Sequence, residues 1–180
     1  MGQRNGGPDP AWARVHGCVA LDTGCGPGRP EAVDRLAILD TVARYHWCVD
    51  ERDANTLASL FTKDSEWAGS VAGTVVLGQV RGRDAVLQWI KSLPAWSVHA
   101  QRRHCAINPM VSRCDGETAE VICYLLLVST GGISTELLST GITRFALAKQ
   151  PDGRWLIDRY FVGLDAAVSD RPANAGEGIR

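Results

Sequence analysis

Hydrophobic residues recur at helical spacing in the first third of the chain. Between residues 31 and 51, Ile38, Val42, Tyr45 and Val49 follow one another at steps of four, three and four residues. This is the period of an α-helix that buries one face against a core. We therefore expect a long amphipathic helix over this segment.

Two shorter helices and two strands are expected next. Residues 52–61 fit a short helix with Asp53 or Asn55 near its cap, and residues 82–93 fit a third helix with one apolar side. Two β-rich segments separated by glycine lie between them: 65–71 and 74–80.

The pattern changes to strands in the second half of the chain. Four long strand-like runs cover residues 98–114, 117–130, 133–149 and 154–165. The turn sequences between them are Asp-Gly, Gly-Gly and Pro-Asp-Gly, which are typical of antiparallel neighbours. Helices followed by strands predict the α+β class, with about three helices packed on one face of a curved antiparallel sheet that encloses a pocket.

Alternation within the strands indicates which side chains face this pocket. His104 and Asn108 share one face of their strand, while Cys105 lies on the other. On the next strand Val121 and Leu125 share a face, yet the opposite face is also largely apolar. Because a strand that is apolar on both sides needs cover on both, we expect a homodimer formed through the outer sheet face.

Length and charge limit the class of the protein. The 180 residues suit one domain, expected at 31–168, between a flexible Gly- and Pro-rich leader at 1–30 and a flexible tail at 169–180. The formal net charge is −1, which provides no bulk attraction for nucleic acid or for an anionic membrane. We expect a small-molecule substrate and no nucleic-acid partner.

Targeting signals and cysteines point to a cytoplasmic protein. No apolar run approaches the roughly 20 residues that a membrane-spanning helix needs, so no membrane partner is expected. The first residues lack the apolar middle segment of a secretory signal. The six cysteines include no C-x-x-C pair, which favours reduced thiols over a disulfide or zinc framework.

Several segments, in their order along residues 31–165, resemble the SnoaL-like branch of the NTF2-like superfamily. They are RYHWCVDERDANTLASLFTKDSEW, VRGRDAVLQWI, RRHCAIN, DGETAEVICYLLL and PDGRWLIDRYFVGLD. The resemblance implies a cone-shaped α+β barrel with a deep pocket, usually dimeric. It includes ketosteroid isomerases, scytalone dehydratase, limonene epoxide hydrolase, polyketide cyclases and several non-enzymes, so the fold leaves the function open.

The resemblance also suggests site residues. Asp50 and His104 match the positions of the aspartate and one histidine of scytalone dehydratase, although the second histidine of that enzyme has no counterpart and its tyrosine is Val49 here. Tyr45 lies where ketosteroid isomerase keeps its oxyanion-binding tyrosine, but the position of that enzyme's base aspartate falls near Gly69. The match is therefore partial for both enzymes.

The residue types themselves suggest acid–base chemistry. A carboxylate at Asp50 can accept a hydrogen bond from one imidazole nitrogen of His104 and leave the other nitrogen to exchange a proton. Tyr45 could donate to a developing enolate oxygen, and Asn108 could position the substrate. The expected apolar lining, which would exclude water, consists of Trp67, Val121, Leu125 and Phe145.

Structural interpretations of the same residues remain open. Asp50 could be a solvated helix end, His104 a core histidine and Tyr45 a packing residue, while His46 is expected on the exposed side of its helix. A metal is not expected, because His104 and Cys105 point to opposite faces of a strand. No G-x-G-x-x-G follows a strand, so no nucleotide cofactor is expected either.

These patterns together predict a cofactor-independent isomerase or lyase. The substrate would be small, hydrophobic and oxygenated, and the reaction an isomerisation, dehydration or cyclisation. The resemblance implies a compound similar to a polyketide or terpenoid. One alternative is a non-catalytic binding or accessory domain that uses the same pocket. The other is a hydrolase resembling the epoxide-opening relatives, for which Arg144 is a candidate pocket residue.

Overall fold

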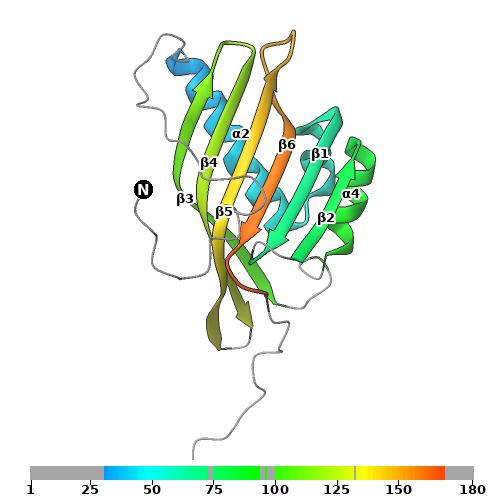
Figure 1. Cartoon of the computed structure of the whole chain (residues 1–180), viewed down its shortest axis with the longest axis vertical. Coiled ribbons are helices and arrows are strands. Elements are labelled where there is room, and N and C mark those ends of the chain that lie inside the picture. Colours follow the sequence, from blue (N-terminus) through cyan, green and yellow to red (C-terminus); the bar gives the residue numbers. More distant parts are fainter. Residues whose placement is uncertain (1–30, 73–74, 94–95, 97–99, 132, 169–180) are drawn as a thin grey trace, which may run out of the picture.

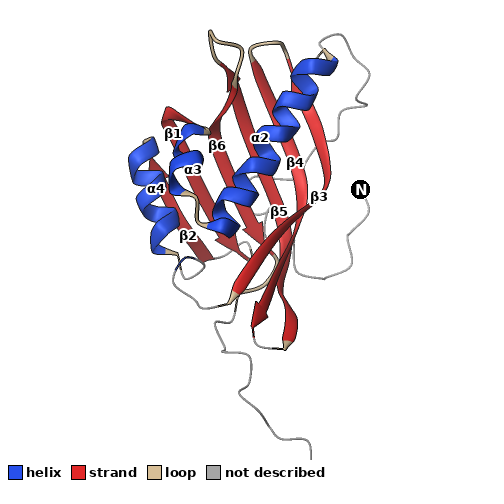
Figure 2. Cartoon of the chain, turned by 180° about the vertical axis from the view of Figure 1, so that it is seen from behind, coloured by secondary structure: helices blue, strands red, loops and turns tan. Residues whose placement is uncertain are grey.

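The fold consists of one sheet with helices on one of its faces (Figures 1 and 2). The computed structural model describes residues 31–168 apart from 73–74, 94–95, 97–99 and 132. The expected leader and tail, and His99, lie outside the described residues.

The three expected helices are confirmed, and all lie on the same face of the sheet (Figure 2). They are α2 (Ala32–Glu51), α3 (Ala54–Ser59) and α4 (Arg83–Ser92). The long helix α2 ends at Arg52, which has a left-handed φ of 57°. Asp53 then caps α3, because its side chain accepts a 3.0 Å hydrogen bond from the backbone N–H of Thr56. Because α3 begins so soon after α2 ends, the position of the last turn of α2 is fixed.

In the described part of the chain, the sheet has six strands in the order β2-β1-β6-β5-β4-β3. Their bounds are β1 (Phe61–Val71), β2 (Val75–Arg81), β3 (Gln101–Cys114), β4 (Thr118–Gly131), β5 (Ser134–Lys149) and β6 (Trp155–Leu164). The neighbouring strands from β3 to β6 are antiparallel, as their turn sequences predict. β1 and β2 are antiparallel as well.

Two details differ from the expected antiparallel barrel. β1 pairs with β6 in parallel, so the sheet is mixed. Turn sequences specify only neighbours in sequence, whereas β1 and β6 are far apart along the chain. The curved sheet also stays unclosed, because β2 and β3 form its two edges.

The core lies between the helices and the face of the sheet that they cover. The four residues of the predicted α2 stripe are all buried, as are Val121 and Leu125 on β4. Their neighbours on β4 alternate outward, and Tyr124 is 61% exposed. The predicted inner and outer faces of this strand are therefore confirmed. None of the described helices is long and apolar enough to cross a membrane.

The paired strands β5 and β6 should not tolerate a side chain at Gly141. A Cβ there would overlap the carbonyl oxygen of Gly163 and lie 3.0 Å from the Cα of Leu164. We expect Gly141→Ala to lower the free energy of unfolding by about 1–3 kcal/mol, because backbone must move to admit the methyl group. Urea unfolding measures the change.

Gly131→Ala is the matched control for this prediction. A Cβ at Gly131 would lie 3.6 Å from the Cβ of Ala100, an ordinary contact. Its effect should stay within about 0.5 kcal/mol. Equal stability of the two variants would contradict the close packing of β5 on β6.

Candidate active site

The structure brings Asp50 and His104 into direct contact. Nδ1 of His104 lies 2.5 Å from Oδ1 of Asp50, and the backbone N–H of His104 donates to Oδ2 at 2.9 Å. The two side chains are only 7% and 17% exposed, respectively. Because an ionised carboxylate only accepts hydrogen bonds, Nδ1 carries a proton and Nε2 is left to exchange one.

Local backbone geometry explains why this contact forms. Asp50 lies in the last turn of α2, where a carboxylate opposes the helix dipole and requires a compensating donor. β3 is an edge strand, which leaves backbone N–H groups without a strand partner. One such group, the backbone N–H of His104, donates a hydrogen bond to Asp50. Gln101 adds a 3.2 Å hydrogen bond from its side chain to the carbonyl oxygen of Asp50.

A cavity of about 350 Å³ lies between the sheet and the helices, and His104 is in its wall. This volume is within the range of small-molecule sites, which is roughly 300–1,000 Å³. Its lining is mainly aliphatic and aromatic. On its other side His104 borders a second hollow of about 260 Å³, which Asp50 and His46 also line. His104 therefore borders both the cavity and the hollow between α2 and β3.

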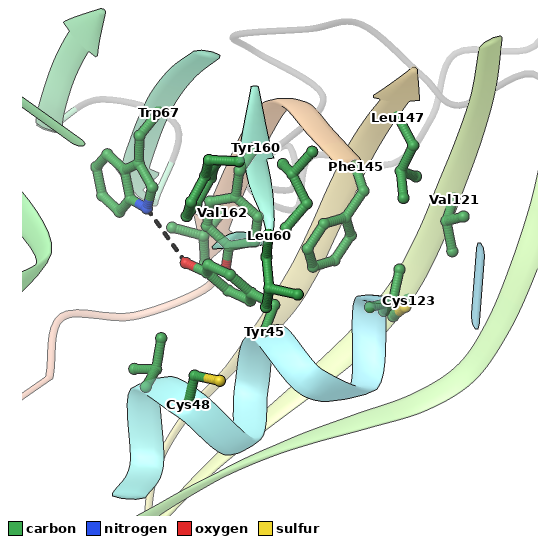
Figure 3. Close-up of a cluster of buried hydrophobic side chains, with 14 of the residues drawn as sticks. Tyr45, Cys48, Leu60, Trp67, Val121, Cys123, Phe145, Leu147, Tyr160 and Val162 are labelled. Carbon is green, nitrogen blue, oxygen red and sulfur yellow. Dashed lines mark hydrogen bonds between the residues drawn. The ribbon is translucent and has the colours of Figure 1, made fainter. Parts of the chain in front are cut away.

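Three aromatic residues place polar atoms in the largely apolar cavity wall. Tyr45, Trp67 and Tyr160 all line the cavity. The indole N–H of Trp67 donates to the hydroxyl oxygen of Tyr45 at 3.4 Å (Figure 3). The rings of Tyr45 and Tyr160 lie 4.5 Å apart between centroids. Burial raises the pKa of both tyrosines, so both hydroxyls stay protonated and can donate.

Some of the other expected pocket residues line the cavity, and others are buried in the hydrophobic core. Trp67 and Leu125 line the cavity as expected. Val121 and Phe145 are buried in the core but are not among the described residues of the lining. Phe145 instead supports Tyr45, with ring centroids 5.4 Å apart.

Two expected pocket residues lie elsewhere. Asn108 is exposed and has a φ of 52°, at a register shift between Ile107 and Met110. This bulge interrupts the alternation from which its inward position was predicted. Arg144 lines a different hollow, on the outer face of the sheet, where it pairs in register with Ile122. Both residues are therefore excluded from the described cavity.

The expectation that His46 is exposed is wrong. This residue is 4% exposed, and its Nδ1 lies 3.0 Å from the carbonyl oxygen of Val42. Its ring stacks on that of His104 at 6.3 Å between centroids. Burial and the nearby His104 lower the pKa of His46 to about 4, so its imidazole is neutral at physiological pH. The curvature of the sheet brings β3 over this side of α2, which helical periodicity does not show.

Arg102 and Tyr160 are polar residues of the cavity wall that were not predicted. Arg102 lines the cavity, and it lies two residues before His104 on the same face of β3. Strand alternation from His104 is the signal that could have identified it. Tyr160 lies on β6 and contacts Tyr45, a proximity that depends on the packing of α2 across the sheet. No sequence spacing links these two tyrosines.

Metal and disulfide chemistry have no visible site in the described part of the chain. Among the described residues, no group of three or more His, Cys, Asp and Glu side chains is arranged to hold a metal ion. The cysteines that are described, Cys48, Cys105, Cys114 and Cys123, are free.

The neutral, buried state of His46 predicts an acid-sensitive stability. Its folded-state pKa of about 4 is below the usual 6.5, so the unfolded chain binds this proton first as the pH falls. The associated stability is complete above the usual pKa and is lost progressively toward pH 4. We expect a loss of about 1 kcal/mol between about pH 7.5 and about pH 5.5, measured by urea unfolding.

The variant His46→Phe isolates this contribution, because phenylalanine keeps a flat aromatic ring at this position and does not titrate. The difference in unfolding free energy between the original chain and this variant should change over the same pH range. A difference that is independent of pH would show that His46 is not the group responsible.

The family comparison agrees with this architecture. The family model described as the SnoaL-like domain matches residues 30–160, which includes both Asp50 and His104. No curated protein sequence matches the chain.

Solved structures with the same fold come from several bacteria. An NTF2-like protein with a cystatin-like fold from Novosphingobium aromaticivorans is 23% identical, with a TM-score of 0.61 over 73% of this chain and 82% of that one. A protein from Catenulispora acidiphila, in complex with S-DNPA, is 20% identical, with a TM-score of 0.62 over 74% and 95%.

A third structure is ActVI-ORFA from Streptomyces coelicolor, which is 20% identical, with a TM-score of 0.62 over 73% of this chain and 97% of that one. Likeness at this identity shows a shared fold. The described sheet and helices accordingly have the NTF2-like architecture that the sequence predicts. With the family model covering most of its length, the chain belongs to the SnoaL-like domain family.

Proposed function

We propose that this protein is a cofactor-independent enzyme that moves a proton on a small, hydrophobic, oxygenated substrate similar to a polyketide or terpenoid. The reaction would be an isomerisation, dehydration or cyclisation. The observation that carries the proposal is the position of His104, which is in the wall of an apolar cavity and is held from behind by Asp50.

His104 would be the proton carrier and Asp50 its positioning residue. Since Nδ1 holds its proton toward the carboxylate, Nε2 is the atom that takes a proton from the substrate or returns one. The imidazolium formed in this step gains stability from the adjacent negative charge of Asp50. The low exposure of the pair strengthens this interaction, because little water screens it.

Tyr45 would stabilise negative charge that develops on a substrate oxygen. Its hydroxyl lies in the cavity wall and remains a hydrogen-bond donor, because burial raises its pKa. Trp67 donates to the same oxygen at 3.4 Å and so leaves the hydroxyl proton available. A donor placed before the reaction needs little reorganisation during it.

A non-catalytic binding domain is the main alternative. The predominantly apolar lining would suit a ligand trap equally well. The hydrolase alternative has less support, since Arg144 faces the outer hollow and the described lining contains no aspartate or glutamate. The two functions are separated by testing whether the protein transfers a proton on a ligand that it binds. An enzyme would do so, and a ligand trap would not.

We expect the protein to accelerate exchange of the α-protons of 2-tetralone in deuterated water, followed by proton NMR. This ketone is apolar and neutral, and its exchange needs only a base and a donor to the carbonyl oxygen. Asp50→Asn and His104→Gln should each reduce the acceleration by about 100-fold or more.

Glu51→Gln is the matched control for Asp50→Asn. Glu51 is the next residue along α2, but its carboxylate is half exposed and pairs with Arg103 at 3.1 Å. This variant should retain the exchange rate. Binding of 2-tetralone without acceleration of its proton exchange would contradict the enzymatic proposal and favour the ligand trap.

We also propose that two copies of the chain associate through the outer sheet face. Ile107 and Tyr124 pair across β3 and β4 on this face and are 36% and 61% exposed. No described helix covers this side of the sheet (Figure 1). Exposed apolar side chains on an uncovered sheet face are typical of an association surface.

Tyr124→Arg should therefore convert a dimer to a monomer, because it places a charge on the proposed contact face. Size-exclusion chromatography with light scattering measures the mass. Trp47→Arg is the control, since Trp47 is 65% exposed on α2, on the opposite side of the molecule. A monomeric unaltered chain would contradict the proposal.

A further inference from the structure

The hollow between α2 and β3 has no part in the proton transfer proposed for the cavity. It measures about 260 Å³ and is bordered by Asp50 and Trp47 from α2 and by Arg103 and His104 from β3. Neither Asp50 nor Trp47 is among the described residues that line the cavity. Since an apolar cavity of about 150 Å³ can bind benzene, this hollow has room for one substituted ring.

The wall of this hollow offers hydrogen-bond acceptors. The side chain of Asp50 is only 7% exposed, and its two oxygens accept from the ring and the backbone of His104. A carboxylate has about four lone-pair sites, so Asp50 retains capacity for another donor. His46 adds a neutral ring, in which Nδ1 lies 3.0 Å from the carbonyl oxygen of Val42 and Nε2 has no partner among the described residues. A ligand that donates hydrogen bonds therefore suits this wall.

The charges around the hollow favour a cation. Arg103 is positively charged, but its Nη1 lies 3.1 Å from Oε1 of Glu51, so these two charges offset each other. His104 adds no charge while its Nε2 is unprotonated. The carboxylate of Asp50 is left, and its low exposure means that little water screens it.

Trp47 provides an aromatic surface beside this carboxylate. Its side chain is 65% exposed, although it also borders the hollow. The face of an indole attracts a cation that lies over it. The small side chains of Ala43 and Ala106, which line the same hollow, leave space for a flat group.

We propose that the hollow between α2 and β3 binds a small planar organic cation of the amidinium type, which donates to Asp50 and lies against Trp47. An amidinium on an aromatic ring combines a positive charge, coplanar N–H donors and a flat apolar surface. It therefore matches the acceptors, the charge and the indole together.

A cation at this site would also act on the proposed function. The carboxylate of Asp50 stabilises the imidazolium form of His104, and a positive charge beside that carboxylate opposes this effect. Occupancy would therefore slow proton transfer from behind, without a ligand entering the cavity. This consequence rests on the proposed function, whereas binding itself does not.

Benzamidine and the neutral, nearly isosteric benzamide are the probes, titrated by calorimetry into the full chain at neutral pH. We expect benzamidine to bind about 10-fold or more tightly than benzamide, as for a hydrogen bond between charged groups. It should also slow exchange of 2-tetralone when that ketone is saturating, because the two ligands occupy different sites.

Asp50→Asn should abolish the preference for benzamidine, because it removes the negative charge and keeps the shape. Asp53→Asn is the matched control. Asp53 is an exposed carboxylate near the same helix end that is not in the lining, and asparagine also caps a helix. This control should keep the full preference.

Two further variants test the wall of the hollow without changing Asp50. Trp47→Leu should weaken benzamidine binding by about 2- to 5-fold, the range for a cation on an exposed indole. Arg103→Gln should instead tighten it, because a positive charge is removed from the wall and Glu51 loses its partner. Tighter binding is not expected from a variant that merely damages the fold.

Several outcomes would overturn the proposal. They are equal affinities of the unaltered chain for the two probes, no binding of benzamidine at millimolar concentration, or a preference that survives in Asp50→Asn. Unchanged benzamidine affinity in both Trp47→Leu and Arg103→Gln would place the ligand elsewhere. The comparison on the unaltered chain remains decisive even where Asp50→Asn fails to fold.

The failure of this proposal differs from that of the proposed function. A preference for benzamidine without exchange of 2-tetralone would leave a cation site on a protein that is not this enzyme. Exchange without the preference would leave the enzyme and exclude the second site.

Discussion

The architecture of the site depends on the carboxylate of Asp50, which joins the end of α2 to the edge strand β3. One oxygen accepts from the His104 ring and the other from its backbone N–H, so the helix and strand are fixed relative to each other. The same contact offsets the unfavourable position of a carboxylate at a helix C-terminus. It also orients the only imidazole in the described lining of the cavity.

The surroundings of this pair are arranged in two layers. On the cavity side lie the hydroxyls and indole of Tyr45, Trp67 and Tyr160, in a wall that is otherwise mostly aliphatic. Behind His104, the neutral His46 stacks on its ring and contributes no charge at physiological pH. The negative charge next to His104 therefore comes from Asp50, and the positive charge farther along the wall from Arg102.

Adjacent residues on one strand serve different surfaces of the molecule. Arg102 lines the cavity while Arg103 pairs with Glu51 outside, and Phe145 supports Tyr45 while Arg144 lines the outer hollow. A single residue step thus separates the cavity wall or the core from the outer face. The β-bulge at Asn108 ends this regular alternation on β3.

Local patterns in the sequence determined much of the fold. The helix periods, the Asp53 cap and the turns of the antiparallel hairpins were predictable, because each depends on residues close together in the chain. The inward faces of Val121, Leu125 and His104 followed from alternation. Asp50 and His104 were paired by resemblance, and the structure places their side chains within hydrogen-bond distance.

Only the tertiary structure decided the relations between distant segments. The parallel pairing of β1 with β6, the burial of His46 under β3 and the approach of Tyr160 to Tyr45 result from how the sheet curves beneath α2. The outward direction of Arg144 depends on strand register. A change of one residue in register moves every side chain of a strand to the opposite face of the sheet. The register depends on the partner strand, so the local sequence does not specify it.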